Sequence, residues 1–417
     1  MLSIKMLQLK NIVAVVALLL AAAALGLLAA AAPARAADPP TADDSGRFLA
    51  GMQPSAQSPL AALTKDPAWQ RHARFFDTAF GQLDQRQLSK IKAWSSANLS
   101  ASKPTMFYMF SGPDFLYADA FYPNATTYVL SALEPVGAVP DLSRLPYLGS
   151  TLGDLEHSMS SILSFSFFIT KHMKTDLRAG EVSGTLPILY VFLARSGKTI
   201  RDVSLIALDE TGAVHAASES SGKTPTRGVR IKFAGSDGVE KTLYFFSTDL
   251  SNSSARTSGF LKFCQTLAPG NSLIKSASYL LHAGNFSVVR DFLLNNSATI
   301  VQDDSGIPLA NYDARKWKFL PFGRYAGPIS EFPGRYQSRY AELFEHAQPM
   351  DFGIGYRWRS HESNLLLAVR LPSDGPGGVE TTASNPVETV QPKPPRPKRP
   401  NPPPPLQQPG GFFFLWR

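Results

Sequence analysis

Apolar side chains recur at helical spacing in the first half of the chain. After Asp66 and Pro67, a favourable helix start, they return every three or four residues within 69–83. The stretch 151–177 has one apolar face, a capping-box pattern at its start and Gly180 beyond its end. We therefore predict one helix after Asp66 and a longer one over 151–177.

Short apolar runs bounded by turn residues predict strands. Two of them, 106–110 and 128–133, enclose a short helical stretch, which is the strand–helix–strand order of an α/β fold. Between 184 and 250, β-rich runs alternate with Gly-containing turns, which predicts an antiparallel segment that starts with a strand over 186–194. The predicted fold class is α/β, a mixed sheet with flanking helices that is compatible with a Rossmann-like three-layer arrangement.

The second half of the chain mixes both patterns. The predicted elements are helices over 260–267, 272–281, 286–294 and 336–344, a strand over 299–301, and a closing hairpin formed by 352–359 and 365–370. No internal repeat is present in the sequence. Residues 60–372 are expected to form a single α/β domain.

The N-terminus has the three ordered parts of a secretory signal. Lys5 and Lys10 precede an unbroken apolar run over 12–32, and residues 34–36 read Ala-Arg-Ala, a small-residue cleavage site. We predict that residues 1–36 are a signal peptide and that the protein is exported to the periplasm or the cell exterior. The alternative is an N-terminal anchor in the inner membrane with the chain facing out, because the run is long enough to span a bilayer.

Composition changes on either side of the predicted domain. Residues 37–59 are mostly polar and are predicted to form a flexible leader. Residues 373–417 are rich in Pro and Gly, contain a basic polyproline stretch over 392–405 and end in aromatic residues. We predict a disordered, proline-rich tail whose extended polyproline stretch serves as a spacer or docking arm.

Charge and cysteine content limit the partners that the protein can be expected to bind and the ways in which its fold can be stabilised. The chain has a formal net charge of +8, of which residues 1–37 carry +3 and residues 373–417 carry +2. The small positive remainder on the globular part gives no reason to predict a nucleic-acid partner. Cys264 is the only cysteine, so no intrachain disulfide is available and the fold must be held by its core.

Motifs for several reaction classes are incomplete. Two Gly-Lys-Thr pieces, at 197–199 and 222–224, lack the preceding glycine of a phosphate-binding loop. A Ser-x-x-Lys pattern at 272–275 lacks the companion motifs of penicillin-recognising acyl enzymes, and no Gly-x-Ser-x-Gly is present. The seven His residues are not paired at metal-binding spacing. We therefore predict neither a cofactor nor a metal site.

Acidic residues that follow predicted strands, with their sequence neighbours, form the candidate ligand site. The members are Asp114, Tyr117, Asp119, Glu134, Asp303 and Asp304. In an open α/β sheet, ligands bind outside the carboxyl ends of the strands, so the acids converge if their strands are parallel neighbours. Such a group suits a polyhydroxyl or cationic ligand, or a general acid and base. The alternative is that these acids cap turns and helices.

A second candidate lies on the predicted closing hairpin. Arg357, Arg359 and His361 together suit an anion, and the alternative is a solvated strand face.

We expect an exported cell-envelope protein that binds a ligand or protein partner without catalysis, with the proline-rich tail as docking arm. A membrane partner is expected only if the N-terminal segment is retained. The alternative is a glycan or cell-wall hydrolase that uses the strand-end acids. Such an enzyme needs Asp114 and either Asp303 or Asp304 within about 10 Å across a concave pocket.

Overall fold

The computed structural model describes residues 39–142, 147–168, 182–218 and 225–372. The chain divides into two compact units, Met1–Pro372 and Ser373–Arg417. The predicted signal peptide or anchor and the predicted tail lie outside the described residues. Within the described residues, no helix is both long enough and apolar enough to cross a bilayer.

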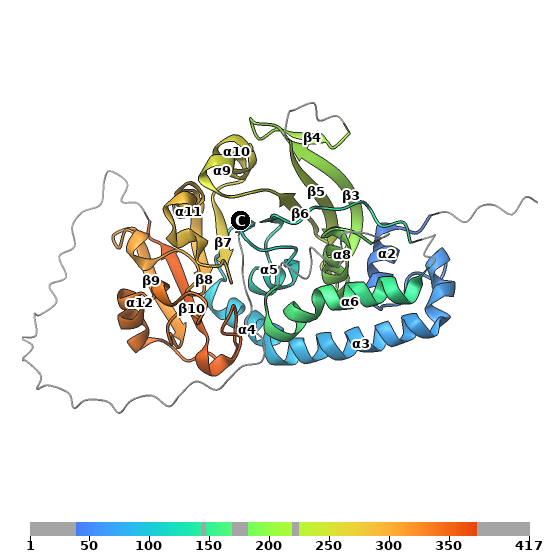
Figure 1. Cartoon of the computed structure of the whole chain (residues 1–417), viewed down its shortest axis with the longest axis horizontal. Helices are drawn as coiled ribbons and strands as arrows, with labels where there is room; N and C mark the ends of the chain where they lie inside the picture. The colour runs from blue at the N-terminus through green and yellow to red at the C-terminus, as the bar shows by residue number, and fades with distance from the viewer. Residues whose placement is uncertain (1–38, 143–146, 169–181, 219–224, 373–417) are drawn as a thin grey trace, which may run out of the picture. The chain divides into compact units, whose positions relative to one another are not determined.

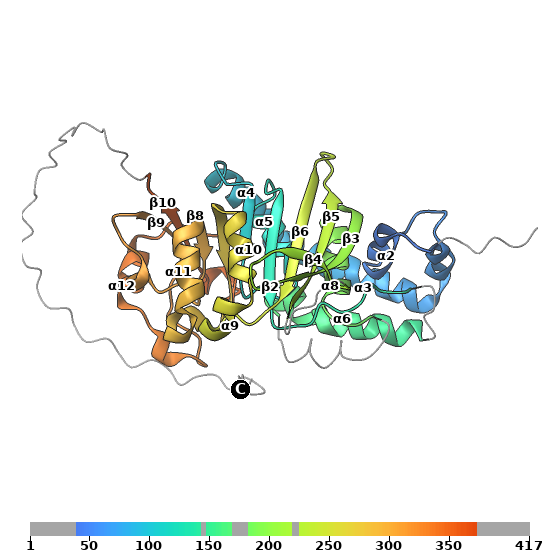
Figure 2. The ribbon, with the colours of Figure 1, turned by 90° about the horizontal axis from the view of Figure 1, so that it is seen from above.

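A mixed sheet of ten strands forms the centre of the described part of the chain (Figure 1). From one edge to the other the strands are β4 (Val214–Ala216), β3 (Thr199–Leu208), β5 (Thr226–Ala234), β6 (Glu240–Ser247), β2 (Thr127–Ala132), β1 (Thr105–Tyr108), β7 (Gly270–Ile274), β8 (Ser297–Gln302), β10 (Asn364–Arg370) and β9 (Trp317–Gly323). Figure 2 shows this order from β9 and β10 to β3. The predicted mixed α/β sheet is therefore confirmed.

The five central strands, β6, β2, β1, β7 and β8, are parallel, and the outer strands on both sides are antiparallel. The antiparallel strands β3 to β6 confirm the antiparallel segment predicted between 184 and 250. From β1 the chain passes through helix α5 (Phe115–Phe121) to β2 on one side, whereas β7 pairs with β1 on the other. The gap between the carboxyl ends of β1 and β7 is thus a topological switch point, where ligands bind in open α/β sheets.

Helices cover both faces of the sheet. The helices whose side chains join the larger core are α2 (Ala42–Leu49), α3 (Pro67–Leu83), α4 (Ser89–Asn98), α5, α6 (Leu148–Phe165) and α8 (Leu186–Arg195). On the opposite face, α9 (Asn252–Thr257), α10 (Phe260–Thr266) and α11 (Ser287–Asn296) close a second core. Along β1, Met106 and Tyr108 belong to the first core and Phe107 to the second, as the alternation of a strand requires.

Shorter elements complete the described structure. They are the π-helical turn η2 (Asp84–Leu88) between α3 and α4, helix α12 (Ser338–Leu343), and the 3₁₀ turns η1 (Pro59–Lys65), η3 (Leu280–His282), η4 (Gly284–Phe286), η5 (Leu309–Asn311), η6 (Pro333–Arg335), η7 (Phe344–His346) and η8 (Ser360–Glu362).

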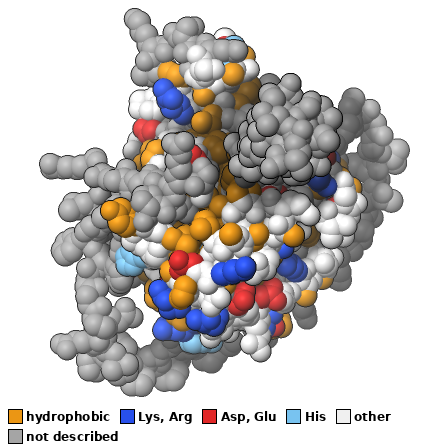
Figure 3. All heavy atoms as spheres, turned by 90° about the vertical axis from the view of Figure 1, so that its right-hand side faces the viewer, with side chains coloured by type: hydrophobic (Ala, Val, Ile, Leu, Met, Phe, Trp, Pro, Cys, Tyr) orange, Lys and Arg blue, Asp and Glu red, His pale blue; other side chains and the backbone are white. Residues whose placement is uncertain are grey.

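The flexible leader predicted over 37–59 is wrong for the residues that form α2. The final carbonyls of this helix accept from side chains of α3: Trp69 donates to Phe48 at 3.0 Å, and His72 Nε2 donates to Leu49 at 2.8 Å. Because Phe48 and Leu49 are also fully buried, α2 is part of the core rather than a leader. The face that carries α2 shows basic and acidic side chains intermixed rather than grouped by sign (Figure 3).

Two secondary-structure predictions are wrong because a continuous apolar run is compatible with a buried helix and with a buried strand. Residues 186–194, predicted as a strand, are all buried within helix α8, which is apolar on every side. Residues 272–281, predicted as a helix, begin inside β7, which is buried on both faces between parallel neighbours.

The predicted closing hairpin is also wrong. Strand β10 lies between β8 and β9 and is antiparallel to both, whereas residues 352–359 contain only an isolated bridge between Ile354 and Arg357. The long helix predicted over 151–177 ends at Phe165, where Ser166 adopts a left-handed conformation with φ of 77°. Residues 169–181, including Gly180, lie outside the described residues.

Candidate functional site

A buried ion pair lies at the switch point between β1 and β7. Asp114 follows β1 and Lys275 follows β7; Lys275 Nζ is 3.0 Å from Asp114 Oδ2, and both side chains are 2% exposed. Tyr108 donates its hydroxyl to the same oxygen at 2.8 Å. The other oxygen, Oδ1, accepts the backbone N–H of Tyr117 at 3.1 Å and so caps α5. The sheet thus places a carboxylate and an ammonium side by side in its interior.

Three kinds of partner surround the Lys275 ammonium. Besides Asp114, it donates to the backbone carbonyl of Ser166, and it lies 3.9 Å from the centre of the Tyr117 ring. A carboxylate, a carbonyl and an aromatic face all stabilise a positive charge. Burial, followed by the negative charge of Asp114, raises the pKa of both Tyr108 and Tyr117 well above the usual value, so both phenols remain neutral donors.

Asp303 closes the same region from the end of β8. Its Oδ1 accepts the backbone N–H of Ser305 at 3.0 Å, and its Oδ2 accepts the N–H of Ser276 at 3.0 Å. Gly355 approaches so closely that a Cβ there would lie 1.9 Å from Oδ2, which leaves no room for a side chain. The charges of both Asp114 and Asp303 raise the pKa of Tyr108, so the two carboxylates lie near the same phenol.

Two side chains donate to the carboxylate of Asp304. Tyr279 donates to its Oδ2 at 2.6 Å, and the amide of Asn364 donates to its Oδ1 at 3.0 Å. Burial raises the pKa of Asp304, and these two hydrogen bonds oppose that shift. Burial and then the charge of Asp304 raise the pKa of Asp303 as well. Two adjacent buried carboxyls therefore favour protonation more than exposed ones do.

The loops on both sides of the switch point have an unusual backbone. After β1, Phe110 has φ of 61°; after β7, Ser276, Ser278 and Tyr279 have φ of 52°, 49° and 53°. Residues with a side chain rarely adopt this left-handed region, and such strain gathers at functional sites. The hydroxyl of Ser276 is in addition buried without a hydrogen-bond partner among the described residues.

Four of the six predicted ligand residues, Asp114, Tyr117, Asp303 and Asp304, lie at the carboxyl ends of β1 and β8, which flank β7. Glu134 is also buried, at 6% exposure, but it follows β2, on the far side of β1 from β7.

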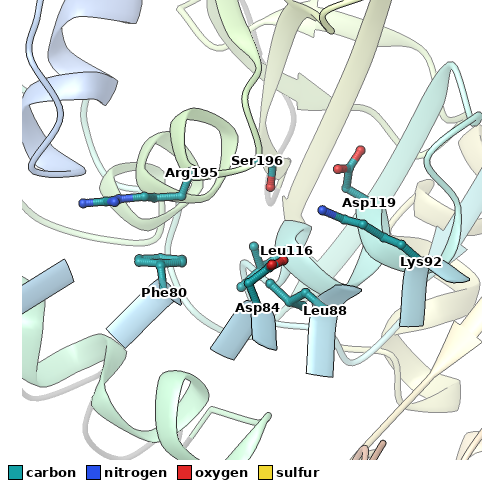
Figure 4. A pocket seen from close by; sticks show the side chains of 8 residues that line it. All are labelled: Phe80, Asp84, Leu88, Lys92, Leu116, Asp119, Arg195 and Ser196. Carbon is teal, nitrogen blue, oxygen red and sulfur yellow. The ribbon is translucent and has the colours of Figure 1, made fainter. Parts of the chain in front are cut away.

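Asp119 lies elsewhere, beside a hollow in the helical layer that covers the sheet. Its Oδ1 is 2.8 Å from Lys198 Nζ. The hollow is lined by Phe80, Asp84, Leu88, Lys92, Leu116, Asp119, Arg195 and Ser196 (Figure 4). The guanidinium of Arg195 lies over the Phe80 ring and extends away from Lys92 and Asp119, so it does not face a ligand in the hollow.

The two arginines of the predicted anion site already donate to carbonyl and carboxylate groups of the protein itself. Arg357 donates to the carbonyls of Gly327 and Pro328 at 2.9 Å each and lies 3.7 Å from Glu362. Arg359 pairs with Glu362 at 3.2 Å, and His361 is exposed. Since the hairpin that suggested this group does not form, the three residues do not line a strand face.

The central residue of the site, Lys275, was missed from the sequence. Residues 272–281 were predicted as a helix, and Lys275 entered only through the Ser-x-x-Lys pattern. In the structure Ser272 lies in β7 and its hydroxyl bonds to that of Ser297 at 2.7 Å, whereas Lys275 follows the strand and pairs with Asp114. A lysine directly after a five-residue buried run is the signal that marks a strand end here.

Comparison with known proteins finds no family model, no curated protein and no solved structure that matches this chain. Within the described ranges, no group of three or more His, Cys, Asp or Glu side chains is placed to hold a metal ion.

Proposed function

We propose that this protein is an exported, non-catalytic binding protein of the cell envelope whose ligand site is the carboxyl edge of β1 and β7. The observation that carries the proposal is the buried Asp114–Lys275 pair at the switch point of the sheet. A buried ion pair adds little net stability, because the desolvation of both charges offsets their attraction. The left-handed residues in the two adjoining loops add strain at the same place. The ion pair and the left-handed residues do not stabilise the fold, yet both lie at the switch point, where ligands bind in open α/β sheets. Their position therefore favours a binding role.

The chemistry of the site suits a hydroxyl-rich or cationic ligand. Carboxylates accept from hydroxyl and amino groups, the Lys275 ammonium donates to oxygen, and neutral phenols do both. Asp114, Asp303 and Asp304 are buried and already accept hydrogen bonds, which favours binding over acid–base catalysis. The proline-rich tail is proposed to dock the protein to an envelope partner.

One observation favours the hydrolase alternative. Burial and the charge of Asp304 raise the pKa of Asp303 toward neutrality, as a general acid requires. The experiment must therefore separate binding from turnover.

The test is calorimetric titration with purified soluble muropeptides, which carry hydroxyl, carboxylate and amino groups. We expect wild-type protein to bind them, Lys275→Met to bind at least about tenfold more weakly because the ammonium is lost, and the muropeptides to be recovered intact by mass spectrometry. Lys232→Met, which removes an exposed lysine 3.1 Å from Glu240, is the matched control and should bind like the wild type.

Three outcomes contradict the proposal. Cleaved muropeptides support the hydrolase alternative, equal binding by the two lysine variants rejects this site, and no binding by the wild type rejects this ligand class.

A further inference from the structure

The last residue of α6 and the three that follow it, Phe165 to Phe168, lie over the buried ion pair, and we call them the strap. The backbone carbonyl of Ser166 accepts from Lys275 Nζ, and the hydroxyl of Ser166 donates to the Gly355 carbonyl at 3.2 Å. On the other side, the Phe168 ring faces the loop after β1, where a Cβ on Gly112 would lie 3.4 Å from it. The strap therefore contacts the loops on both sides of the switch point.

Aromatic contacts hold the strap in place. The ring of Phe165 is 5.6 Å from that of Trp358, the ring of Phe167 is 5.1 Å from that of Tyr356, and Phe168 is 6.1 Å from Phe192. Phe165 is 37% exposed, and the other two phenylalanines are partly exposed. Ser166 itself is fully buried with φ of 77°. Ser166, whose backbone is strained, is thus buried, whereas the phenylalanines of the strap are partly exposed.

We infer that the strap is a built-in closure of the site, in which the Ser166 carbonyl occupies the position of a ligand oxygen on Lys275. The inference rests on the proposed function and adds its regulation. Lys275 is saturated by Asp114, by Tyr117 and by this carbonyl. A ligand must therefore displace the Ser166 carbonyl and supply a carbonyl, carboxylate or hydroxyl oxygen in its place, since an ammonium left without that acceptor inside the protein is costly.

The closure is tested by thiol labelling, which needs no ligand. The Ser276 hydroxyl, on the residue after Lys275, is buried and has no partner among the described residues, so Ser276→Cys places a reporter thiol at a buried position next to Lys275 in the chain. Iodoacetamide is the probe, and mass spectrometry gives the labelling rate of each cysteine peptide. The native Cys264, fully buried in the opposite core, reports global opening in the same sample.

We expect Phe168→Ala, added to Ser276→Cys, to increase labelling at position 276 at least about tenfold and to leave Cys264 labelling unchanged, because the strap opens locally. Phe75→Ala, which removes a 40% exposed ring on α3, is the matched control and should change neither rate more than about twofold. An unchanged rate at position 276, or an equal rise at both cysteines, overturns the closure.

Muropeptide titration of Phe168→Ala separates this inference from the proposed function. Tighter binding than wild type is expected, because the competing carbonyl is released. Faster labelling without any muropeptide binding leaves the closure standing and rejects the proposed function. Faster labelling with unchanged binding overturns the role of the Ser166 carbonyl as a competitor.

Discussion

At the scale of single residues, the molecule is defined by charges inside a sheet. Lys275 and Asp114 satisfy each other, and Tyr108 and the Tyr117 N–H complete the shell of the carboxylate. Removing one partner leaves the other buried and unpaired, whereas removing both leaves only neutral groups. The pair therefore makes a measurable prediction.

Lys275→Met is expected to lower the free energy of unfolding by about 3–5 kcal/mol, because it leaves the Asp114 carboxylate buried without its cation. Adding Asp114→Asn, which retains the helix-capping oxygen, should restore most of that loss. Urea unfolding of the two single variants and the double variant measures the coupling. Lys232→Met, at an exposed pair, should change stability by less than about 1 kcal/mol. Additive effects of the two buried substitutions would contradict the pairing.

The carboxyl pair at the end of β8 predicts a pH dependence. Because burial raises the pKa of Asp304 in the folded state, the folded protein binds more protons than the unfolded chain above the ordinary aspartate value of about 4. The contribution of this residue is thus fully favourable below pH of about 4 and is lost as pH rises through the raised folded value.

Asp304→Asn should therefore show a shallower fall in stability with rising pH than the wild type, as measured by urea midpoints between pH 4 and 8. Asparagine keeps an oxygen for Asn364 and an amide for the Tyr279 hydroxyl. The control of opposite sign is Asp313→Asn. Hydrogen bonds from Arg315 hold the pKa of Asp313 below its usual range, so its contribution is lost only as pH falls. Parallel pH profiles for wild type and Asp304→Asn would refute the prediction.

At the scale of elements, the last turn of α2 shows how a polar stretch becomes part of a core. Three successive carbonyls at its end accept from side chains of other helices: Trp69 to Phe48, His72 to Leu49, and Arg195 to Ala50 at 2.8 Å. His72 also contacts Glu156 of α6 at 2.7 Å. Since Trp69 and His72 belong to α3 and Arg195 belongs to α8, α2 is held by tertiary contacts with two other helices.

A chain that begins at residue 59 should be less stable than one that begins at residue 39. Loss of the buried Phe48 and Leu49 side chains removes about 1.5–3 kcal/mol each, and the donors of Trp69, His72 and Arg195 lose their acceptors. Thermal unfolding of the two chains measures the difference. Equal unfolding temperatures would show that α2 does not contribute to the core.

At the scale of the whole molecule, the described fold ends at the boundary between its two compact units. The last strand, β10, is the inner partner of β8 and β9, and it ends at Arg370. Because β10 is paired on both sides, it needs no further strand from the residues that follow it.

Deletion of residues 373–417 is therefore expected to leave the unfolding temperature unchanged within about 2 °C, because the shorter chain keeps every strand and core residue of the described structure. If the tail is a docking arm, the same deletion releases the protein from the cell envelope in a fractionation experiment. Replacing Pro392 to Pro405 by a Gly–Ser segment of equal length serves as the control for a pure spacer. Undiminished envelope attachment after the deletion would reject the docking role.

Local patterns predicted much of the architecture but little of the site's centre. The spacing of Trp69, Phe76 and Leu83 predicts a helix, because side chains at this spacing form one apolar stripe that is buried when the helix packs against the core. The positions of Asp114 and Asp303 after strands can likewise be predicted from the sequence, because each residue follows an apolar run. The role of Lys275 cannot be predicted in this way, since its ion-pair partner, its carbonyl acceptor and its aromatic neighbour come from segments more than 100 residues away.

By itself, the sequence determined a mixed α/β sheet, the helix over 67–83 and the acids that end the first and eighth strands, because periodicity and turn chemistry act within a few residues. Only the tertiary structure decided that 186–194 is a helix and that 270–274 is a strand. Both runs are fully buried, and the small difference in local propensity is outweighed by the neighbours that supply hydrogen bonds and cover. Tertiary structure alone also decided that Lys275 meets Asp114 beneath the strap, because parallel strand order brings distant strand ends to one edge.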